Sequence, residues 1–486
     1  MKRVKLCSQQ TVRHRGLVAA CALLSAIVAI PAIPASGVRS GAAAPGARSA
    51  PATLTSRLDA YVSTVAQGDR FAGAVLVARG KSLLLAKGYG LANVERKVAN
   101  TAATQFRIGS ITKTFTAVAV LQLVQRGRLS LDDSVCTYLE ACPPRWRPIT
   151  IRMLLAHTAG LSETLDDASW KRLRRVPLPR AVARLRTLPL AFKPGTRWSY
   201  CNACYLVAGL IVERVAGVPW LSYLRQHIFR PAGMKSTTYD TGAAGASEAR
   251  AYVPNRFGVL VPQPTLAMAD PDTAGGLKST VTDLDRFSRA LDGDRLLSRR
   301  FRKLMFEATK ASHDSWSLGW EIGRRRGHRF ERHTGSVGGW GAVLTRYPDL
   351  DLTVVVLANL AGEAVAQINH NLPAIVLGWS VTLAALPPLT NVSPSLLANY
   401  VGVYVATSHG RLRLEINRAA GDASSLVLFP GPYGGGDRLG AMSKRRFIDL
   451  RAPHWSVEFR VNGGRATSVV VRSTRPRISF VARRIH

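Results

Sequence analysis

The sequence predicts a protein of the α+β class with a small all-β domain at its C-terminal end. Strand-like patterns occur near the start of the chain, at 71–88, and return at 316–357, while the long stretch between them is mainly helical in pattern. After Leu386-Pro387-Pro388, short alternating runs separated by glycine-rich turns replace the helical patterns. With 486 residues the chain is long enough for two or three domains with sizeable cores.

The elements of the larger part are expected in order along residues 54–386. A helix around 54–66 comes first, and strands at 71–78 and 82–88 form a hairpin around Arg79-Gly80-Lys81. Further helices are expected at about 110–124, 203–215, 218–227, 281–291 and 298–306. A short helix is expected to end in the turn 154–161, and another helix to begin at about 363. Further strands are expected at 316–322, 330–333, 341–347 and 352–357. The Gly- and Pro-rich stretch 240–275 is expected to be irregular loop. The apolar segment 372–386 is too short and too Pro-bounded to span a membrane and fits a core helix.

Residues 390–486 are expected to form a separate, small β-rich domain. Its strand-like runs alternate with turns such as Gly434-Gly435-Gly436 and lie at 400–405, 411–416, 425–429, 446–449, 456–461, 467–472 and 478–482. This pattern of many short strands is typical of a compact all-β accessory domain.

The N-terminus predicts export. Basic residues up to Arg15 precede an apolar run from Leu17 to about Ile33, and small residues follow it, which is the order of a secretory signal peptide over residues 1–35. An uncleaved membrane anchor is the alternative, but Pro31 and Pro34 favour cleavage. Residues 36–53, rich in Ala, Gly, Pro and Ser, are expected to form a flexible linker. We therefore expect a periplasmic or secreted protein.

The formal net charge of +36 is the unusual feature of the composition. A field of this sign draws a protein toward anionic surfaces and acidic polymers and says nothing about its fold. The basic residues are spread over the whole chain and no nucleic-acid-binding signature accompanies them. Association with an anionic cell-envelope surface is therefore expected, and nucleic acid is not expected as a partner. The sequence leaves the oligomeric state open.

Four cysteines remain after removal of a signal peptide: Cys136, Cys142, Cys201 and Cys204. An even number in an oxidising compartment is typical of disulfides. Three pairings exist, of which the local 136–142 and 201–204 set is the simplest. No thioredoxin-like pattern surrounds Cys201-x-x-Cys204, so a structural bridge or plain thiols are favoured over a redox motif.

A serine and a lysine one helical turn apart are the first candidates for chemistry. Ser110 and Lys113 lie in Phe106–Phe115, at the start of an apolar helix, and their spacing puts them on one helix face. An amine within hydrogen-bond reach can take the proton of a serine if its own pKa is lowered. The N–H groups at a helix start also favour a developing oxyanion.

Two further groups of candidates follow in the chain. Tyr200 and Asn202 stand two residues apart at a loop-to-helix junction, where a phenol can shuttle a proton and a carboxamide can hold a substrate carbonyl. His333, Thr334, Gly335 and Ser336 close a predicted strand, where a glycine permits close approach and a free N–H can complete an oxyanion hole. His157, in the turn of 154–161, is expected to be a buried structural histidine.

The order Ser-x-x-Lys, Tyr-x-Asn, His-Thr-Gly resembles the active-site set of the penicillin-recognising serine hydrolases, in the branch of class C β-lactamases, D,D-peptidases and related esterases. The stretches 106–110, 154–161, 194–200 and 274–280, and Gly209-Leu210-Ile211 with Gly217, also look like this family, and the resemblance covers about 55–380. It implies a β-lactamase/transpeptidase-like fold, in which an antiparallel sheet flanked by helices is joined to an all-α region.

The resemblance also implies a mechanism. Ser110 would form an acyl-enzyme that water releases, Lys113 and Tyr200 would share the proton transfers, and Asn202 would orient the substrate. The N–H groups of Ser110 and Ser336 would hold the oxyanion. Neither a cofactor nor a metal is expected, because the sequence has no His-Glu-x-x-His helix and no clustered Cys/His ligands.

His333 departs from the antibiotic-hydrolysing members, which carry lysine at this position. A histidine is largely neutral at pH 7 and holds a substrate carboxylate less well. We therefore expect a hydrolase of small-molecule esters and amides or of peptides. Two alternatives are a β-lactamase or D,D-carboxypeptidase of the cell wall, and a catalytically silent binding protein on the same fold.

Overall fold

The computed structural model describes residues 53–67, 70–162, 176–240, 245, 247–263, 272–309, 315–381, 388–407, 412–431, 436–474 and 477–485. The predicted signal peptide and all but the last residue of the predicted linker lie outside this set. Within the described residues no single helix is long and apolar enough to cross a membrane. One bent helix pair, Asn202–Ala216 with Trp220–Ala232, could cross a membrane judged by its length and composition only.

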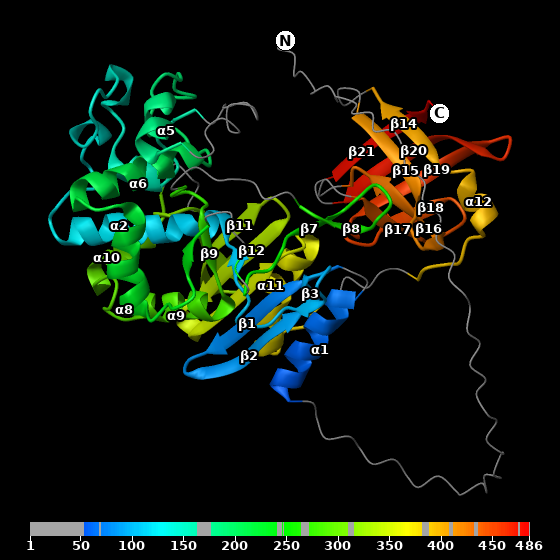
Figure 1. The fold of residues 1–486 in the computed structure, drawn as a ribbon, viewed down its shortest axis with the longest axis horizontal. Helices are drawn as coiled ribbons and strands as arrows, with labels where there is room; N and C mark the ends of the chain where they lie inside the picture. The colour runs from blue at the N-terminus through cyan, green and yellow to red at the C-terminus, as the bar shows by residue number, and fades with distance from the viewer. Residues whose placement is uncertain are drawn as a thin grey trace, which may run out of the picture. The chain divides into compact units, whose positions relative to one another are not determined.

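A six-stranded antiparallel sheet forms the centre of the described part of residues 53–381 (Figure 1). Its strand order is β10-β11-β12-β13-β1-β2, with bounds Glu321–Arg325, His328–Val337, Trp340–Tyr347, Leu352–Ala358, Gly73–Arg79 and Ser82–Tyr89. Strands from both ends of this region are thus neighbours, with Leu76 of β1 opposite Val355 of β13. The antiparallel sheet expected from the family resemblance is confirmed.

Both faces of this sheet are covered. Val75 and Val77 of β1 join the core beneath α1 (Leu54–Ala66) and α11 (Glu363–Val376), whereas Ala74 and Leu76 join the core on the opposite face. Because successive side chains of a strand point to opposite faces, a strand buried on both sides is apolar throughout, as this one is up to Arg79.

The second face of the sheet carries the helical region. Its helices are α2 (Thr112–Gln125), α3 (Ile151–Leu155), α5 (Leu178–Leu185), α6 (Asn202–Ala216), α7 (Trp220–Leu224), α8 (Arg230–Ala232), α9 (Val281–Asp292) and α10 (Arg299–Met305). Helix α2 is buried from Thr112 to Leu123 and packs against α6, so its apolar residues need no amphipathic pattern.

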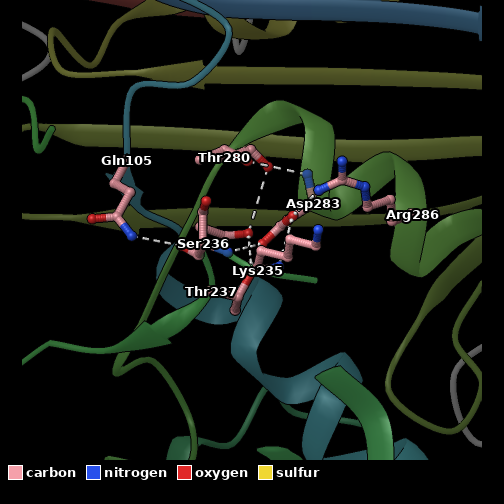
Figure 2. A network of polar contacts seen from close by, with 8 residues as sticks. Gln105, Lys235, Ser236, Thr237, Thr280, Asp283 and Arg286 are labelled. Carbon is pink, nitrogen blue, oxygen red and sulfur yellow. Dashed lines mark hydrogen bonds and ion pairs between the residues drawn. The ribbon is translucent and has the colours of Figure 1, made fainter. Parts of the chain in front are cut away.

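A small three-stranded sheet, β5-β9-β6, joins three distant parts of the chain (Phe106–Arg107, Leu277–Ser279 and Thr238–Tyr239). Figure 2 shows the polar network beside it, which centres on the buried carboxylate of Asp283. Asp283 accepts hydrogen bonds from the backbone N–H of Ser236 at 2.7 Å and from Thr237 Oγ1 at 2.9 Å, and its own N–H donates to Thr280 Oγ1 at 3.1 Å. The network fixes the start of α9 against the loop before β6.

The stretch 240–275 contains regular structure that its composition did not predict. A short hairpin, β7 (Tyr252–Pro254) with β8 (Leu260–Pro262), lies within it. Its turn hydrogen-bonds to the C-terminal domain, where the N–H of Ala420 donates to the carbonyl of Phe257 at 2.9 Å. A contact between residues so far apart in the sequence leaves no signal in local periodicity.

The C-terminal region is a closed eight-stranded antiparallel barrel, which confirms the predicted small all-β domain. Its strands are β14 (Gly402–Ala406), β15 (Leu412–Ala419), β16 (Asp422–Phe429), β17 (Asp437–Ala441), β18 (Arg446–Asp449), β19 (Trp455–Asn462), β20 (Arg465–Thr474) and β21 (Arg477–Arg484). A short helix, α12 (Pro394–Ala398), precedes it. The sequence patterns missed β17, in which Gly440 lowers the strand signal.

Two sequence expectations in the first region are wrong in extent. The strand expected at 316–322 begins only at Glu321, because 315–319 forms a bend that carries Trp316 into the helical region. The core helix expected over 372–386 is the end of α11, which stops at Val376 before Gly378 takes a positive φ of 68°. Residues 382–387 lie outside the described residues.

We predict that Asp283→Ala lowers the free energy of unfolding by about 3–5 kcal/mol, because several buried donors lose a charged acceptor together. Urea unfolding followed by circular dichroism measures this change. Asp294→Ala is the control: its side chain is 77% exposed, so a change below about 0.5 kcal/mol is expected. Equal effects of the two substitutions would contradict the role given to the network.

Candidate active site

Ser110 lies in a single 3-10 turn, Gly109–Ile111, directly before α2. Gly109 has a positive φ of 50°, and a Cβ built on it would meet the backbone nitrogen of Ser336 at 3.0 Å. A side chain at 109 would therefore crowd the strand that carries Ser336. The glycine before the serine keeps the two backbones in contact, and Ser110 itself is only half-buried.

Lys113 is completely buried, and its amine is held at Ser110. Its Nζ donates to Ser110 Oγ at 3.1 Å, to Asn202 Oδ1 at 2.7 Å and to the carbonyl of Ala274 at 2.9 Å. A buried amine needs such acceptors, because an unpartnered one would carry the full desolvation cost. The spacing of Ser110 and Lys113 on one helix face is thus realised as a direct contact.

Tyr200 lies beside the same amine, at the residue before the cap of α6. The centre of its ring is 4.9 Å from Lys113 Nζ. The same ring stacks against the ring of His157, with 4.5 Å between the ring centres. The structure therefore brings Ser110, Lys113, Tyr200 and Asn202 together around one point, as the family resemblance implied.

His157 supports this loop and is buried, as expected from the sequence. Its Nδ1 accepts a hydrogen bond from the backbone N–H of Cys201 at 2.9 Å, so the proton of the neutral ring sits on Nε2. Burial, then the charge of Lys113, lowers the pKa of His157 well below its ordinary value. Disulfides join Cys201 to Cys204 and Cys136 to Cys142, which is the simplest of the three pairings.

The strand β11 passes directly against the Ser110 turn. A Cβ built on Gly335 would lie 2.0 Å from the carbonyl oxygen of Ile108 and 3.2 Å from the nitrogen of Ser110, so only glycine fits there. Gly335 pairs with Ala342 and Ser336 pairs with Gly341, both of β12. The side chains of Thr334 and Ser336 are exposed. The backbone nitrogens of Ser110 and Ser336 thus lie at one backbone contact, and an oxyanion hole needs two such donors close together.

His333 is buried beside the same group and is neutral. Its Nδ1 lies 2.7 Å from the carbonyl oxygen of Thr334 and therefore carries the proton. Burial, then the charge of Lys113, lowers the pKa of His333 to about 3. Its ring centre is 6.5 Å from that of Tyr200. No lysine-like positive charge is therefore present at this position near pH 7.

The structure adds neighbours that the sequence patterns did not single out. The ring of Trp316 lies 5.9 Å from that of Tyr200 and 5.5 Å from that of His333, and the ring of Trp198 lies 5.6 Å from that of Trp316. Asp272 Oδ1 accepts from the N–H of Ala274 at 2.9 Å, and burial raises its pKa. Only the resemblance at 274–280 pointed toward this loop.

The comparisons with known proteins agree with this geometry. Residues 58–375 match the family model described as Beta-lactamase. Penicillin-binding protein 4* of Bacillus subtilis (strain 168) is 25% identical over 452 residues, which are 85% of this chain and 95% of that protein. The structure of a D-stereospecific amidohydrolase from Streptomyces sp. is 26% identical, has a TM-score of 0.55, and is matched over 65% of this chain and 97% of that one.

The fold recurs in a more distant structure. The octameric penicillin-binding protein homologue from Pyrococcus abyssi is 23% identical, with a TM-score of 0.60 over 88% of this chain and 99% of that one. This likeness supports the fold, and the family model covers most of the chain. The resemblance read from the motifs is confirmed. The chain therefore belongs to the beta-lactamase family, among the penicillin-recognising serine hydrolases, and is a serine hydrolase.

Proposed function

We propose that the protein is an exported serine hydrolase that cleaves ester, amide or peptide substrates through an acyl-enzyme on Ser110. The observation that carries this proposal is the buried amine of Lys113, 3.1 Å from Ser110 Oγ. No merely structural role requires an amine to be buried against a half-exposed hydroxyl at a helix start.

The geometry supports a two-step reaction. As Ser110 Oγ bonds to the substrate carbonyl carbon, its proton passes to Lys113 in its neutral amine form or to Tyr200 in its phenolate form, and the N–H groups of Ser110 and Ser336 hold the oxyanion. The leaving group takes that proton as its bond to carbon breaks. Water then attacks the acyl-enzyme by the same route and restores the serine. Lys113 donates to Oδ1 of Asn202, and the role we assign to Asn202 is to orient the substrate.

The neutral His333 supports neutral acyl groups as substrates. A carboxylate bound next to it would gain no ion pair from this side chain, unlike one bound next to a lysine. The likeness to an amidohydrolase supports amides or peptides, and the likeness to penicillin-binding proteins keeps a cell-wall β-lactamase or D,D-carboxypeptidase as the alternative. A catalytically silent binder is the third candidate, against which the assembled groups argue.

Export is part of the same proposal. It is supported by the basic, apolar, small-residue order of the N-terminus. The two local disulfides fit an oxidising compartment. The net charge of +36 favours association with an anionic cell-envelope surface.

We predict that Ser110→Ala lowers kcat/KM about 10⁴-fold or more, because the nucleophile is lost. A short-chain p-nitrophenyl ester, a D-amino acid p-nitroanilide and nitrocefin are assayed side by side, so that the active substrate also separates the first two functions. Ser63→Ala, at an exposed position of α1, is the matched control and is expected to retain full activity. Absence of Ser110-dependent turnover of every substrate would leave the silent binder.

We predict that His333→Lys increases hydrolysis of nitrocefin relative to hydrolysis of the ester, because the lysine adds a cation for the carboxylate. His333→Gln, which is neutral, is the control for the loss of the imidazole. Steady-state kcat/KM values for both substrates measure the ratio. A His333→Lys enzyme that folds and hydrolyses the ester, yet gains no nitrocefin hydrolysis, counts against the role given to His333.

The neutrality of His333 can be tested apart from activity. Its pKa is about 3 in the folded protein and about 6.5 in an unfolded chain, so below pH 6.5 the unfolded chain binds a proton that the folded protein does not. We predict that the free energy of unfolding falls as the pH drops below about 6.5. The contribution of His333 to this slope is up to about 1.4 kcal/mol per pH unit.

Urea unfolding from pH 7.5 to 4.5 measures this slope. His333→Gln is expected to show a shallower slope, since one buried histidine has been removed while His157 remains. Identical slopes in the two proteins would show that His333 is already protonated in the folded state.

A further inference from the structure

Four arginines gather on the outer face of the barrel, on the neighbouring strands β18 to β21. In the register, Arg446 is opposite Glu458, Arg460 is opposite Ser468, and Ser468 is in turn opposite Arg483. Arg472 is opposite Ser456 and stands four residues along β20 from Ser468. The alternate residues of these strands form the barrel core: Phe447, Val457, Phe459, Val469, Val471, Phe480 and Ala482. Because side chains alternate between faces, Arg446, Arg460, Arg472 and Arg483 all point outward. We call these four residues the arginine face.

The positive charge of this face is largely uncompensated. Glu458 is its acidic residue, and it accepts from Arg472 Nη1 at 2.5 Å. The pKa of Glu458 is held below its usual range, chiefly by Arg472 and to a smaller extent by Arg446 and Arg460. These three arginines therefore lie near this one carboxylate. Within the part of the chain that the structure describes, no carboxylate lies within ion-pair distance of Arg446, Arg460 or Arg483.

These arginines are also accessible. Arg446, Arg460 and Arg483 are exposed, and the side chain of Arg472 is 42% exposed. Lys444 and Arg445, in the turn before β18, extend the same charge and are exposed as well. Adjacent strands lie about 4.8 Å apart, so the four strands spread the guanidinium groups over roughly 15 Å. Their mutual repulsion is relieved by an anion that spans the face.

The chemistry of the face selects the kind of anion. One guanidinium group can bind two oxygens of a phosphate, and several guanidinium groups on one face can bind successive phosphates of a chain. The outward residues around the arginines are Ile448, Ser456, Glu458, Ser468, Val470, Ser479 and Val481, of which Ile448, Ser468 and Val470 are buried. These offer neither an aromatic platform for stacked bases nor a set of large apolar side chains for insertion into lipid.

We propose that the arginine face binds the backbone of a linear phosphate polymer and so holds the hydrolase on an anionic matrix. The interaction is sequence-independent and electrostatic. It is separate from the chemistry at Ser110, so it stands or falls without the proposed reaction.

Binding of the full chain to inorganic polyphosphate, measured by calorimetry or by anisotropy of labelled polymer between 50 and 300 mM salt, tests this proposal. The face variant is Arg446→Gln/Arg460→Gln/Arg483→Gln. The matched control is Arg147→Gln/Arg180→Gln/Arg300→Gln, which removes the same charge from exposed positions outside the barrel. Ester hydrolysis and the thermal melting temperature are measured for all proteins, and both variants are expected to match the wild type.

The face variant is expected to bind polyphosphate at least about 10-fold more weakly at 150 mM salt, and the slope of log K against log[salt] is expected to be shallower by about 2. The control variant is expected to lose less than about 3-fold. Equal losses in the two variants would assign binding to the overall charge and overturn the proposal. Binding to phosphatidylglycerol vesicles but not to polyphosphate would assign the face to a membrane instead.

If the face variant melts at a lower temperature, the three single substitutions and the Arg→Lys triple variant are measured in its place. Each single substitution is expected to make the slope of log K against log[salt] shallower by about 0.7–0.9. The Arg→Lys triple variant is expected to have the slope of the wild type. Unchanged slopes in the single variants would exclude the arginine face as the binding surface.

Discussion

The burial of the Lys113 amine is the constraint on which the site depends. An amine without solvent must be surrounded by acceptors, and these come from three separate segments: the Ser110 turn, the start of α6 at Asn202, and the carbonyl of Ala274. The amine of Lys113 therefore has all its hydrogen-bond acceptors only when the helical region closes around α2. The same closure places Tyr200 beside the amine, so folding and assembly of the site are one process.

A second constraint is the contact of two backbones. Strand β11 can reach the Ser110 turn only because Gly109 and Gly335 have no side chains at the point of contact. The central sheet fixes that approach, since β11 is held by β10 on one side and by β12 on the other. The backbone nitrogens of Ser110 and Ser336 are thus placed by backbone geometry, whereas the amine of Lys113 is placed by its side-chain hydrogen bonds.

This difference explains what could be predicted from the sequence. Ser110 with Lys113, and Tyr200 with Asn202, are local motifs whose spacing carries their meaning, and strongly periodic elements such as α1, β1 and α6 were placed to within a few residues. Bringing these motifs to one point is a property of the fold, which only the resemblance supplied. Trp316, Asp272 and the β7–β8 hairpin were missed because their positions depend on long-range contacts. The end of α11 was missed because continued apolar sequence hid the glycine that stops it.

The barrel is connected to the turn between β11 and β12 by a short series of hydrogen bonds. Arg451 is paired with the buried Asp437 at 2.7 Å and donates to the carbonyl of Ala361 at 2.5 Å. The N–H of Ala361 in turn donates at 2.8 Å to the carbonyl of Gly339, in the turn between β11 and β12. Burial raises the pKa of Asp437, so its ionised form depends on the guanidinium of Arg451. This guanidinium donates to a buried carboxylate in one domain and to a carbonyl in the other. If it left either group, that group would remain desolvated and without its hydrogen-bond donor. The barrel is therefore joined to the hydrolase region through a contact that is costly to break and that ends at Gly339, three residues along the chain from Ser336.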